Sequence, residues 1–290
     1  MRIVVTGARG QLGAAVVHEC SSRHDVVALD RQALDVTDDR AVESTMGGAH
    51  PDVIINCAAH NDVDGAEDDP IKALNVNAFA VRALARAAAA IDAVLVHYSS
   101  DFVFDGTASV PYTEEDRPNP RSTYAVSKLL GEWFAADAPR SFVLRVETLF
   151  GQTPGGWPPK GTVAGLLSKM KAGEDVKVFH DRTLSPTYVL DAARATLQLI
   201  ERGAPTGVYH CVNSGRCTWL ELGRELAASF GLQPRLVPVR MNDVPLRAPR
   251  PLYCALSNQK LLSVGIQMPT WQDAVARYAA AQAQGSRLKA

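Results

Sequence analysis

The chain has 290 residues, of which 47% are hydrophobic and 21% are charged, an ordinary composition for a globular protein with a sizeable core. Its 30 basic and 31 acidic residues give a formal net charge of −1, so no overall positive field favours nucleic acid or a membrane surface as a partner. The N-terminal apolar run is too short for a signal peptide, and the five cysteines form no Cys-x-x-Cys pair. We therefore expect a cytoplasmic protein with free thiols.

Through the first half of the chain, short apolar runs alternate with longer helical patterns. The apolar runs are rich in valine and isoleucine and predict buried strands at 2–6, 25–29, 52–56, 93–99 and 141–145. Helices are predicted between them, at 11–21, 38–46, 71–91 and 122–136. This strict alternation indicates right-handed βαβ units, and hence a parallel sheet with helices on both faces.

The pattern loosens in the second half. Residues 151–161 contain four glycines and three prolines, which predicts a mobile loop. Further elements are predicted as helices at 162–171, 190–202, 219–230 and 271–281 and strands at 176–179 and 207–212. We therefore expect an α/β protein with a Rossmann-like, doubly wound parallel sheet in residues 1–150, completed by part of 181–212. A smaller C-terminal substrate-binding lobe is expected mainly in residues 151–290.

Glycine recurs at every third position directly after the first predicted strand, where the first helix begins. This pattern allows a tight turn, close approach of the main chain to a diphosphate, and close packing of helix on strand. The helix N-terminus also attracts an anion. The spacing differs from the commonest Gly-x-Gly-x-x-Gly fingerprint, so the prediction of a dinucleotide site also depends on the residues that follow the neighbouring strands. The contacts expected here for a dinucleotide are Gly7, Arg9, Gly10, Gln11, Leu12 and Gly13.

Residues that follow the next two strands support the same prediction. Asp30 ends the second strand at the distance where a carboxylate accepts hydrogen bonds from the adenosine ribose, which favours NADH. Arg31 follows directly and could instead bind the 2′-phosphate of NADPH, so the choice between the two cofactors stays open. Other expected contacts with the cofactor lie at or beyond strand ends: Asp35, Val36, Cys57, Ala58 and Ala59.

A tyrosine and a lysine are predicted on one face of the helix at 122–136. Tyr124 and Lys128 are four residues apart, so their side chains lie one helical turn apart. An ammonium group beside a phenol is expected to lower the pKa of the tyrosine and to bring it within reach of proton transfer. The fourth strand places Tyr98 and Ser100 at its carboxyl end, where ligands bind in such sheets. Ser100 could therefore bond a substrate carbonyl to which Tyr124 donates a proton.

Together these features resemble the extended short-chain dehydrogenase/reductase superfamily over the whole chain, and within it the dTDP-4-dehydrorhamnose reductases. The stretches that carry the resemblance are Gly10-Gln-Leu-Gly13, Leu34-Asp-Val-Thr-Asp38, Pro51-Asp-Val-Ile-Ile-Asn56, Val63-Asp64 with Ala66-Glu67, Ser100-Asp101 leading to Val103-Phe104-Asp105-Gly106, Ser185-Pro-Thr-Tyr188 and Arg250-Pro251. The set is specific for the subgroup, well beyond a general dinucleotide-binding pattern.

The resemblance implies a reaction and a role for each residue. Tyr124 would be the proton donor, Lys128 would orient the nicotinamide ribose, and Ser100 would occupy a position usually held by threonine. Asp101 would contact the sugar. The implied reaction is hydride transfer from NADPH or NADH to the 4-keto carbon of a nucleotide-activated 6-deoxysugar, in a monomer or a homodimer. Some relatives hold magnesium at a dimer contact, but no metal site is predicted here.

Two stretches depart from the family pattern, and both fall in the expected sugar pocket. The family usually has Arg-Thr-Ser-Trp after the fifth strand, where this chain has Arg145-Val-Glu-Thr148. A late Arg-Pro-Ala-Asn-Ser pattern appears here as Arg250-Pro-Leu-Tyr-Cys254. Thr148 thus stands where a tryptophan would lie against the sugar, and Trp157 in the following loop could replace that wall. The reduction chemistry is expected to be retained, while the identity of the sugar stays open.

Two other functions share parts of this pattern. One is a non-catalytic, NADP-binding regulatory subunit like the beta subunit of methionine adenosyltransferase, which has a similar Ser-Ser-Asp stretch. The retained Tyr124 and Lys128 favour catalysis over this alternative. The other is a nucleotide-sugar epimerase or dehydratase, and a dehydratase usually has more acidic residues after the strand-end hydroxyl than the single Asp101.

Overall fold

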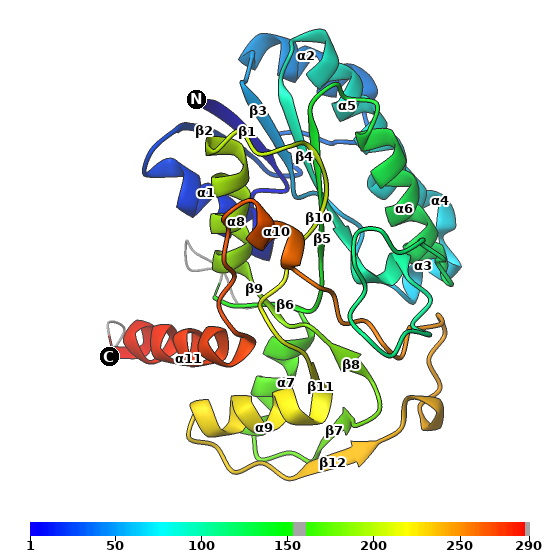
Figure 1. Ribbon diagram of the computed structural model, residues 1–290, viewed down its shortest axis with the longest axis vertical. Coiled ribbons are helices and arrows are strands. Elements are labelled where there is room, and N and C mark those ends of the chain that lie inside the picture. The colour runs from blue at the N-terminus through cyan, green and yellow to red at the C-terminus, as the bar shows by residue number, and fades with distance from the viewer. Residues whose placement is uncertain (153–160, 288–290) are drawn as a thin grey trace.

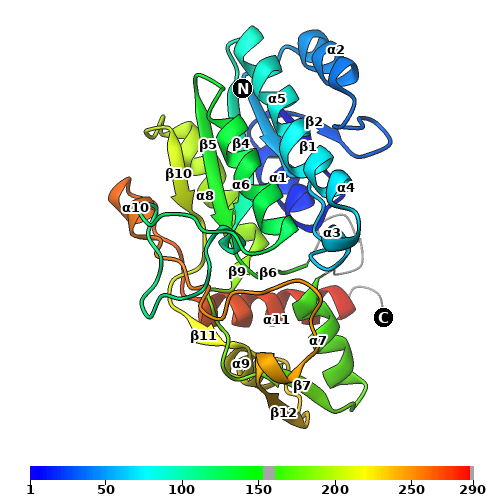
Figure 2. The ribbon, with the colours of Figure 1, turned by 90° about the vertical axis from the view of Figure 1, so that its right-hand side faces the viewer.

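The computed structural model describes residues 1–152 and 161–287. Six parallel strands form its central sheet in the order β10-β5-β4-β3-β1-β2 (Figures 1 and 2). These strands are β1 (Arg2–Thr6), β2 (Asp25–Leu29), β3 (Val53–Asn56), β4 (Val94–Ser100), β5 (Ser141–Val146) and β10 (Gly207–His210). The connections reverse direction between β1 and β3, so the crevice at the carboxyl ends of these two strands is the expected place for a ligand.

Helices cover both faces of the sheet, as the sequence predicts. One face packs against α1 (Gln11–Ser21) and α8 (Val189–Glu201), and the other against α2 (Asp39–Ala49), α5 (Ala80–Ala90) and α6 (Thr123–Ala135). Neighbouring strand residues therefore point to opposite cores: Ile3 and Val5 pack on the α1 side, and Val4 packs on the α2 side. The predicted doubly wound fold is confirmed, and the predicted strands of the first half are present with ends within one residue.

The helix predicted at 71–91 is less regular than its sequence indicates. After the short α3 (Gly65–Asp68), the chain forms α4 (Pro70–Leu74), a π-helical turn (Asn75–Phe79) and then α5. The side chain of Asn77 in this turn accepts from the main-chain N–H of His60 at 2.8 Å and donates to the carbonyl oxygen of His60 at 3.0 Å. It also donates to the hydroxyl of Ser127 at 2.9 Å. The wider turn thus fits Asn77 between a loop and α6, a long-range constraint that an alanine-rich helical pattern does not reveal.

The C-terminal half adds a smaller lobe below the sheet in Figure 1. It contains α7 (Thr162–Lys171), α9 (Trp219–Ser229) and three two-stranded pairs: β6 (Leu149–Phe150) with β9 (Thr187–Tyr188), β7 (Val176–Phe179) with β12 (Leu236–Val239), and β8 (Thr183–Leu184) with β11 (Cys217–Thr218). Three-residue helical turns occur at Asp101–Val103 and Met241–Asp243, and α10 (Gln259–Ser263) precedes the last helix. Most of the loop predicted at 151–161 lies outside the described residues. The division into domains at residue 150 stays a prediction, although β10 completes the sheet.

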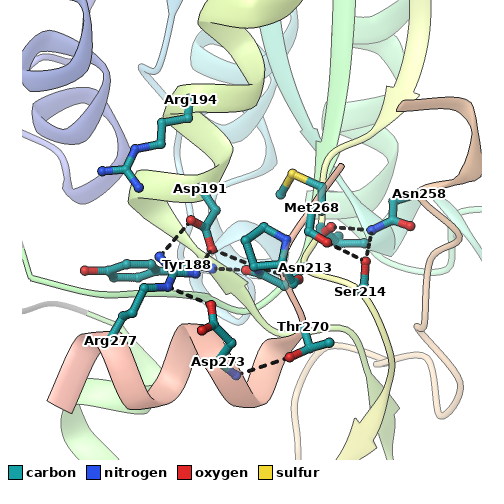
Figure 3. A network of polar contacts seen from close by, with 12 residues as sticks. Tyr188, Asp191, Arg194, Asn213, Ser214, Asn258, Met268, Thr270, Asp273 and Arg277 are labelled. Carbon is teal, nitrogen blue, oxygen red and sulfur yellow. Dashed lines mark hydrogen bonds and ion pairs between the residues drawn. The ribbon is translucent and has the colours of Figure 1, made fainter. Parts of the chain in front are cut away.

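A buried polar network fastens the last helix to the sheet half (Figure 3). Arg277 in α11 (Trp271–Arg287) makes a two-pronged ion pair with Asp191 of α8, at 2.9 and 2.6 Å. Asn213 donates to the same carboxylate at 2.7 Å and accepts from the main-chain N–H of Tyr188 at 2.7 Å. Because paired charges and bonds of this kind fix geometry, the lobe has a defined position beside the carboxyl ends of the strands.

Two further observations concern the cysteines and the helices. All five cysteines are free thiols. Among the described residues, no helix combines the length and the apolar character needed to span a membrane.

Candidate active site

The glycine turn after β1 forms a cradle that side chains would fill. Gly7 has a φ of +64°, and a Cβ atom there would lie 2.7 Å from the main-chain nitrogen of Ala58. A Cβ atom on Gly13 would lie 2.3 Å from the carbonyl oxygen of Gly7, so this glycine lets the helix pack on the turn. The N-terminus of α1, at Gly10, has no side-chain cap and no acidic residue in its first turn. Its N–H groups are therefore available to an anion such as a diphosphate.

A pocket of about 610 Å³ opens beside this cradle at the switch point between β1 and β3. Its lining includes most of the predicted cofactor contacts: Gly7, Arg9, Gly10, Asp30, Arg31, Asp35, Val36, Cys57, Ala58 and Ala59. Arg9 forms an ion pair of 2.7 Å with Asp30. The carboxylate of Asp30 also accepts from the main-chain N–H groups of Ala33 and Gln32, and these bonds, with Arg9, lower its pKa. Asp30 is thus an anion paired with Arg9, and Arg31 lines the same pocket.

A second pocket of about 710 Å³ continues from the first along the carboxyl ends of β4 and β5. The two share Gly10, Cys57, Ala59 and Asn61 in their linings. Apart from Gly13, the second pocket brings together the remaining cofactor predictions and the predicted catalytic and sugar-binding residues: Gln11, Leu12, Tyr98, Ser100, Asp101, Tyr124, Lys128 and Thr148. Gly13 lines neither pocket, because its role in the fold is the packing of α1 against the turn.

Tyr124, Lys128 and Ser100 meet in this second pocket. Tyr124 and Lys128 are 7% and 3% exposed, on the face of α6 that packs against β4. The ammonium of Lys128 donates to the carbonyl oxygen of Tyr98 at 2.6 Å. The hydroxyl of Tyr98 bonds Thr196 of α8 at 2.6 Å, so Tyr98 presents its main chain and not its hydroxyl to Lys128. Ser100 donates to the carboxylate of Asp101 at 2.9 Å.

The pKa of Tyr124 differs from the expectation. Burial raises it above its ordinary value, and the negative charge of Asp101 adds to the rise, while the hydrogen bond with Ser100 opposes it. The net direction of the shift is thus opposite to the lowering that the sequence predicts. Burial also lowers the pKa of Lys128 to about 8.

Asp101, Glu147 and Arg182 line this pocket and form, with the buried Cys254, a group that the sequence analysis only partly identified. The carboxyls of Asp101 and Glu147 and the sulfur of Cys254 lie within 4.8 Å of one another. Arg182 lies 4.0 Å from Asp101 and donates to the sulfur of Cys254 at 3.4 Å. Such a trio could hold a cation, but the guanidinium already supplies positive charge there. That the chain binds no metal stays a prediction.

The sequence analysis did not identify three residues that line the pocket: Arg182, Trp219 and Asn61. Arg182 follows a predicted strand and precedes the Ser185-Pro-Thr-Tyr188 stretch, and this position was the one available signal. Trp219 begins α9 and comes from the opposite lobe, so nothing local relates it to Thr148, which lines the same pocket. Trp219 therefore supplies an indole to the same pocket in which Thr148 stands at the position of the family's usual tryptophan. Trp157, suggested for that purpose, lies outside the described residues.

Arg250 closes one side of the pocket by joining distant segments. Its guanidinium makes a two-pronged ion pair with Asp64, with both distances 2.8 Å, and Asp64 also accepts from the N–H of Ala248 at 2.9 Å. These bonds lower the pKa of Asp64 to about 2. The Val63-Asp64 and Arg250-Pro251 stretches, both noted in the sequence, are therefore partners in the folded chain.

This sheet, with its glycine cradle and a Tyr/Lys pair beside it, defines an NAD(P)-dependent oxidoreductase of the extended short-chain dehydrogenase/reductase superfamily. Comparison with known proteins gives the particular group. The model of the RmlD substrate binding domain family matches residues 1–284, and the chain belongs to this family. It is 37% identical to a dTDP-4-dehydrorhamnose reductase from Mycobacterium tuberculosis, over 99% of this chain and 95% of that protein.

Solved structures of similar proteins agree with this assignment. A dTDP-4-dehydrorhamnose reductase from Clostridium acetobutylicum has a TM-score of 0.91 and 32% identity, covering 97% of this chain and 99% of that one. A dTDP-4-dehydrorhamnose reductase from Bacillus anthracis, solved in complex with NADP, has a TM-score of 0.90 and 31% identity, covering 96% and 98%. The resemblance inferred from sequence is confirmed.

Proposed function

We propose that the protein reduces the 4-keto group of a dTDP-activated 6-deoxysugar, as a reductase like the dTDP-4-dehydrorhamnose reductases. The main support is the convergence of the buried Tyr124, Lys128 and Ser100 in one pocket that continues into the glycine cradle. The family and the names of the relatives point to the same chemistry.

The cradle and the first pocket fit a reduced nicotinamide dinucleotide. Gly7 and Gly10 leave room for its diphosphate at the N-terminus of α1, and the adenosine ribose would lie near Asp30. Arg9 pairs with Asp30 and neutralises the charge of its carboxylate. Arg31 would then favour a 2′-phosphate, so both NADPH and NADH fit this pocket. When bound, the cofactor supplies the hydride for the keto carbon.

The residues of the second pocket would handle the proton. Tyr124 is a phenol at neutral pH because burial raises its pKa, and this is the form required of a proton donor to the keto oxygen. The hydroxyl of Ser100, now directed to Asp101, can rotate to hold the same oxygen. Lys128 carries its ammonium below a pKa of about 8. One turn from Tyr124, it would stabilise the phenolate left after transfer and bond the nicotinamide ribose.

The experiment that tests this function is a kinetic screen with purified protein. Nucleotide-activated 4-ketosugars, including dTDP-4-dehydrorhamnose, are mixed with NADPH or NADH, and loss of absorbance at the reduced nicotinamide band is followed. Turnover that disappears in Tyr124→Phe would support the assignment. Binding of NADPH with no turnover on any sugar would favour the regulatory-subunit alternative.

A further inference from the structure

The two stretches that depart from the reductase pattern meet in the folded chain. Glu147 follows β5, and Cys254 lies far along the chain in the C-terminal half, yet each places a ligand atom within 4.8 Å of the other and of the Asp101 carboxylate. All three side chains are buried. Asp101 and Glu147 also line the pocket that contains Tyr124. The departures therefore form one feature of the sugar pocket.

Polar atoms in this part of the pocket lack hydrogen-bond partners. Glu147 uses one oxygen, Oε2, to accept from the main-chain N–H of Ser185 at 2.5 Å, and Asp101 uses Oδ1 to accept from Ser100. Within the described part of the chain, Glu147 Oε1 and Asp101 Oδ2 have no hydrogen-bond partner at bonding distance. Arg182 lies 4.0 Å from Asp101 Oδ2, and the Cys254 thiol is close enough to oppose the rise in pKa of both carboxyls. Trp219 Nε1, from the opposite wall of the same pocket, also lacks one among those residues. Because unpaired buried polar groups are costly, this arrangement points to a polar ligand.

The charges indicate which oxygen carries a proton. The single guanidinium of Arg182 faces both carboxyls, and Cys254, Cys217 and Tyr253, the other titratable groups around Glu147, are neutral at pH 7 because burial raises their pKa values. Burial, reinforced by the charge of Asp101, raises the pKa of Glu147 well above its ordinary value. Burial also raises the pKa of Asp101, but Arg182 and the hydrogen bond from Ser100 oppose that rise, so Glu147 is the carboxyl of the pair that holds the proton. Glu147 is then a neutral acid. Its proton lies on Oε1, because Oε2 already accepts from Ser185.

We propose that Glu147 and Asp101 form a subsite for the hydroxyl on the sugar carbon next to the keto carbon. Glu147 Oε1 donates to this hydroxyl, and the hydroxyl donates to Asp101 Oδ2, so that each of these two oxygens gains a hydrogen bond. In a 4-keto-6-deoxyhexose the neighbours of the keto carbon are C3, which bears a hydroxyl, and C5, which bears a methyl group. The subsite therefore binds the 3-hydroxyl of the sugar. This inference rests on the proposed function and adds the group that sets its substrate preference.

The test compares two dTDP-4-keto-6-deoxysugars that differ only in the presence of the 3-hydroxyl. For the wild-type protein, kcat/KM should favour the 3-hydroxy sugar roughly 10- to 100-fold, the range expected when one buried polar group is left unpaired. Glu147→Ala should reduce this preference to about threefold or less, since it removes the donor. Glu147→Gln should keep the preference, because its amide N–H₂ replaces the donor and its oxygen still accepts from Ser185. Glu43→Gln, at an exposed site on α2, is the matched control.

Binding of NADPH and the thermal unfolding midpoint show whether each variant is folded. An equal preference in the wild-type protein and folded Glu147→Ala would overturn the subsite while leaving the reductase intact. Loss of the preference in folded Glu147→Gln would also overturn it, because a neutral donor would then not be what the subsite uses. If the wild-type protein reduces neither sugar nor any other 4-ketosugar, the proposed function fails and the subsite fails with it.

Discussion

The ammonium of Lys128 and the carbonyl oxygen of Tyr98 lie 2.6 Å apart, so the lysine of α6 is held against the end of β4. Burial raises the pKa of Tyr124 on the same helix, so its phenol is protonated at neutral pH. This is the state that the proposed role of Tyr124 as proton donor requires. The consequences for catalysis can be measured one residue at a time.

Tyr124→Phe should lower kcat by about 10²- to 10⁴-fold, the usual contribution of a general acid. The ring and its edge-on contact with Phe102 remain, so the Kd for NADPH should stay close to that of the wild-type protein. Tyr209→Phe removes a hydroxyl outside both pockets, which bonds Pro205, and is the control. Near-wild-type turnover in Tyr124→Phe would show that another group donates the proton.

Affinity for NADPH should fall as the pH rises through about 8, the value to which burial lowers the pKa of Lys128. Below that pH the ammonium is present for the ribose, and above it the amine is neutral. Lys128→Met should bind NADPH more weakly at neutral pH and should lack this step, as well as losing activity. Titrations by nicotinamide fluorescence between pH 6.5 and about 9.5 would measure both curves. The same step in Lys128→Met would assign it to another group.

Arg31→Ala should weaken the binding of NADPH about three- to tenfold and should leave the binding of NADH almost unchanged. The loss is modest because the arginine is exposed. The reason is that the ion pair between Arg9 and Asp30 leaves Arg31 to face a 2′-phosphate. Kd values for both cofactors would be compared with those of Arg235→Ala, at another exposed arginine in the other lobe. Equal losses for the two cofactors would mean that Arg31 does not recognise the phosphate.

Thr148 has a φ of +39°, a left-handed conformation that is unfavourable for a β-branched residue. Thr148→Gly should therefore stabilise the chain by about 1 kcal/mol, after the entropic cost of glycine is subtracted from the relieved strain. Thermal unfolding would show this as a higher midpoint. Thr206→Gly, at an exposed position with negative φ, should lower the midpoint. A lower midpoint for Thr148→Gly would mean that contacts of the threonine outweigh the strain.

Local patterns in the sequence predict much of this site. The glycine turn, the strand ends and the Tyr124/Lys128 spacing depend on neighbours in the chain, and the structure brings them to one pair of connected pockets. The approach of Glu147 to within 4.8 Å of Cys254 and the pairing of Arg250 with Asp64 depend on how the second lobe packs beside the sheet. The hydrophobic periodicity of a sequence does not predict such an arrangement of distant segments. The same holds for the direction of the Lys128 ammonium, which is set by a main-chain carbonyl.

The central claim is tested most directly by kcat/KM for NADPH-dependent reduction of dTDP-4-dehydrorhamnose beside related nucleotide 4-ketosugars. Thr148 stands where the family usually has a tryptophan, so the pocket lacks the apolar wall that would lie against the sugar of dTDP-4-dehydrorhamnose. We predict detectable but inefficient reduction of dTDP-4-dehydrorhamnose, faster reduction of a related 4-ketosugar, and loss of both in Tyr124→Phe. If dTDP-4-dehydrorhamnose is the best substrate by a wide margin, the altered sugar pocket is contradicted. If no 4-ketosugar supports oxidation of NADPH, the assignment as a reductase of these sugars is contradicted.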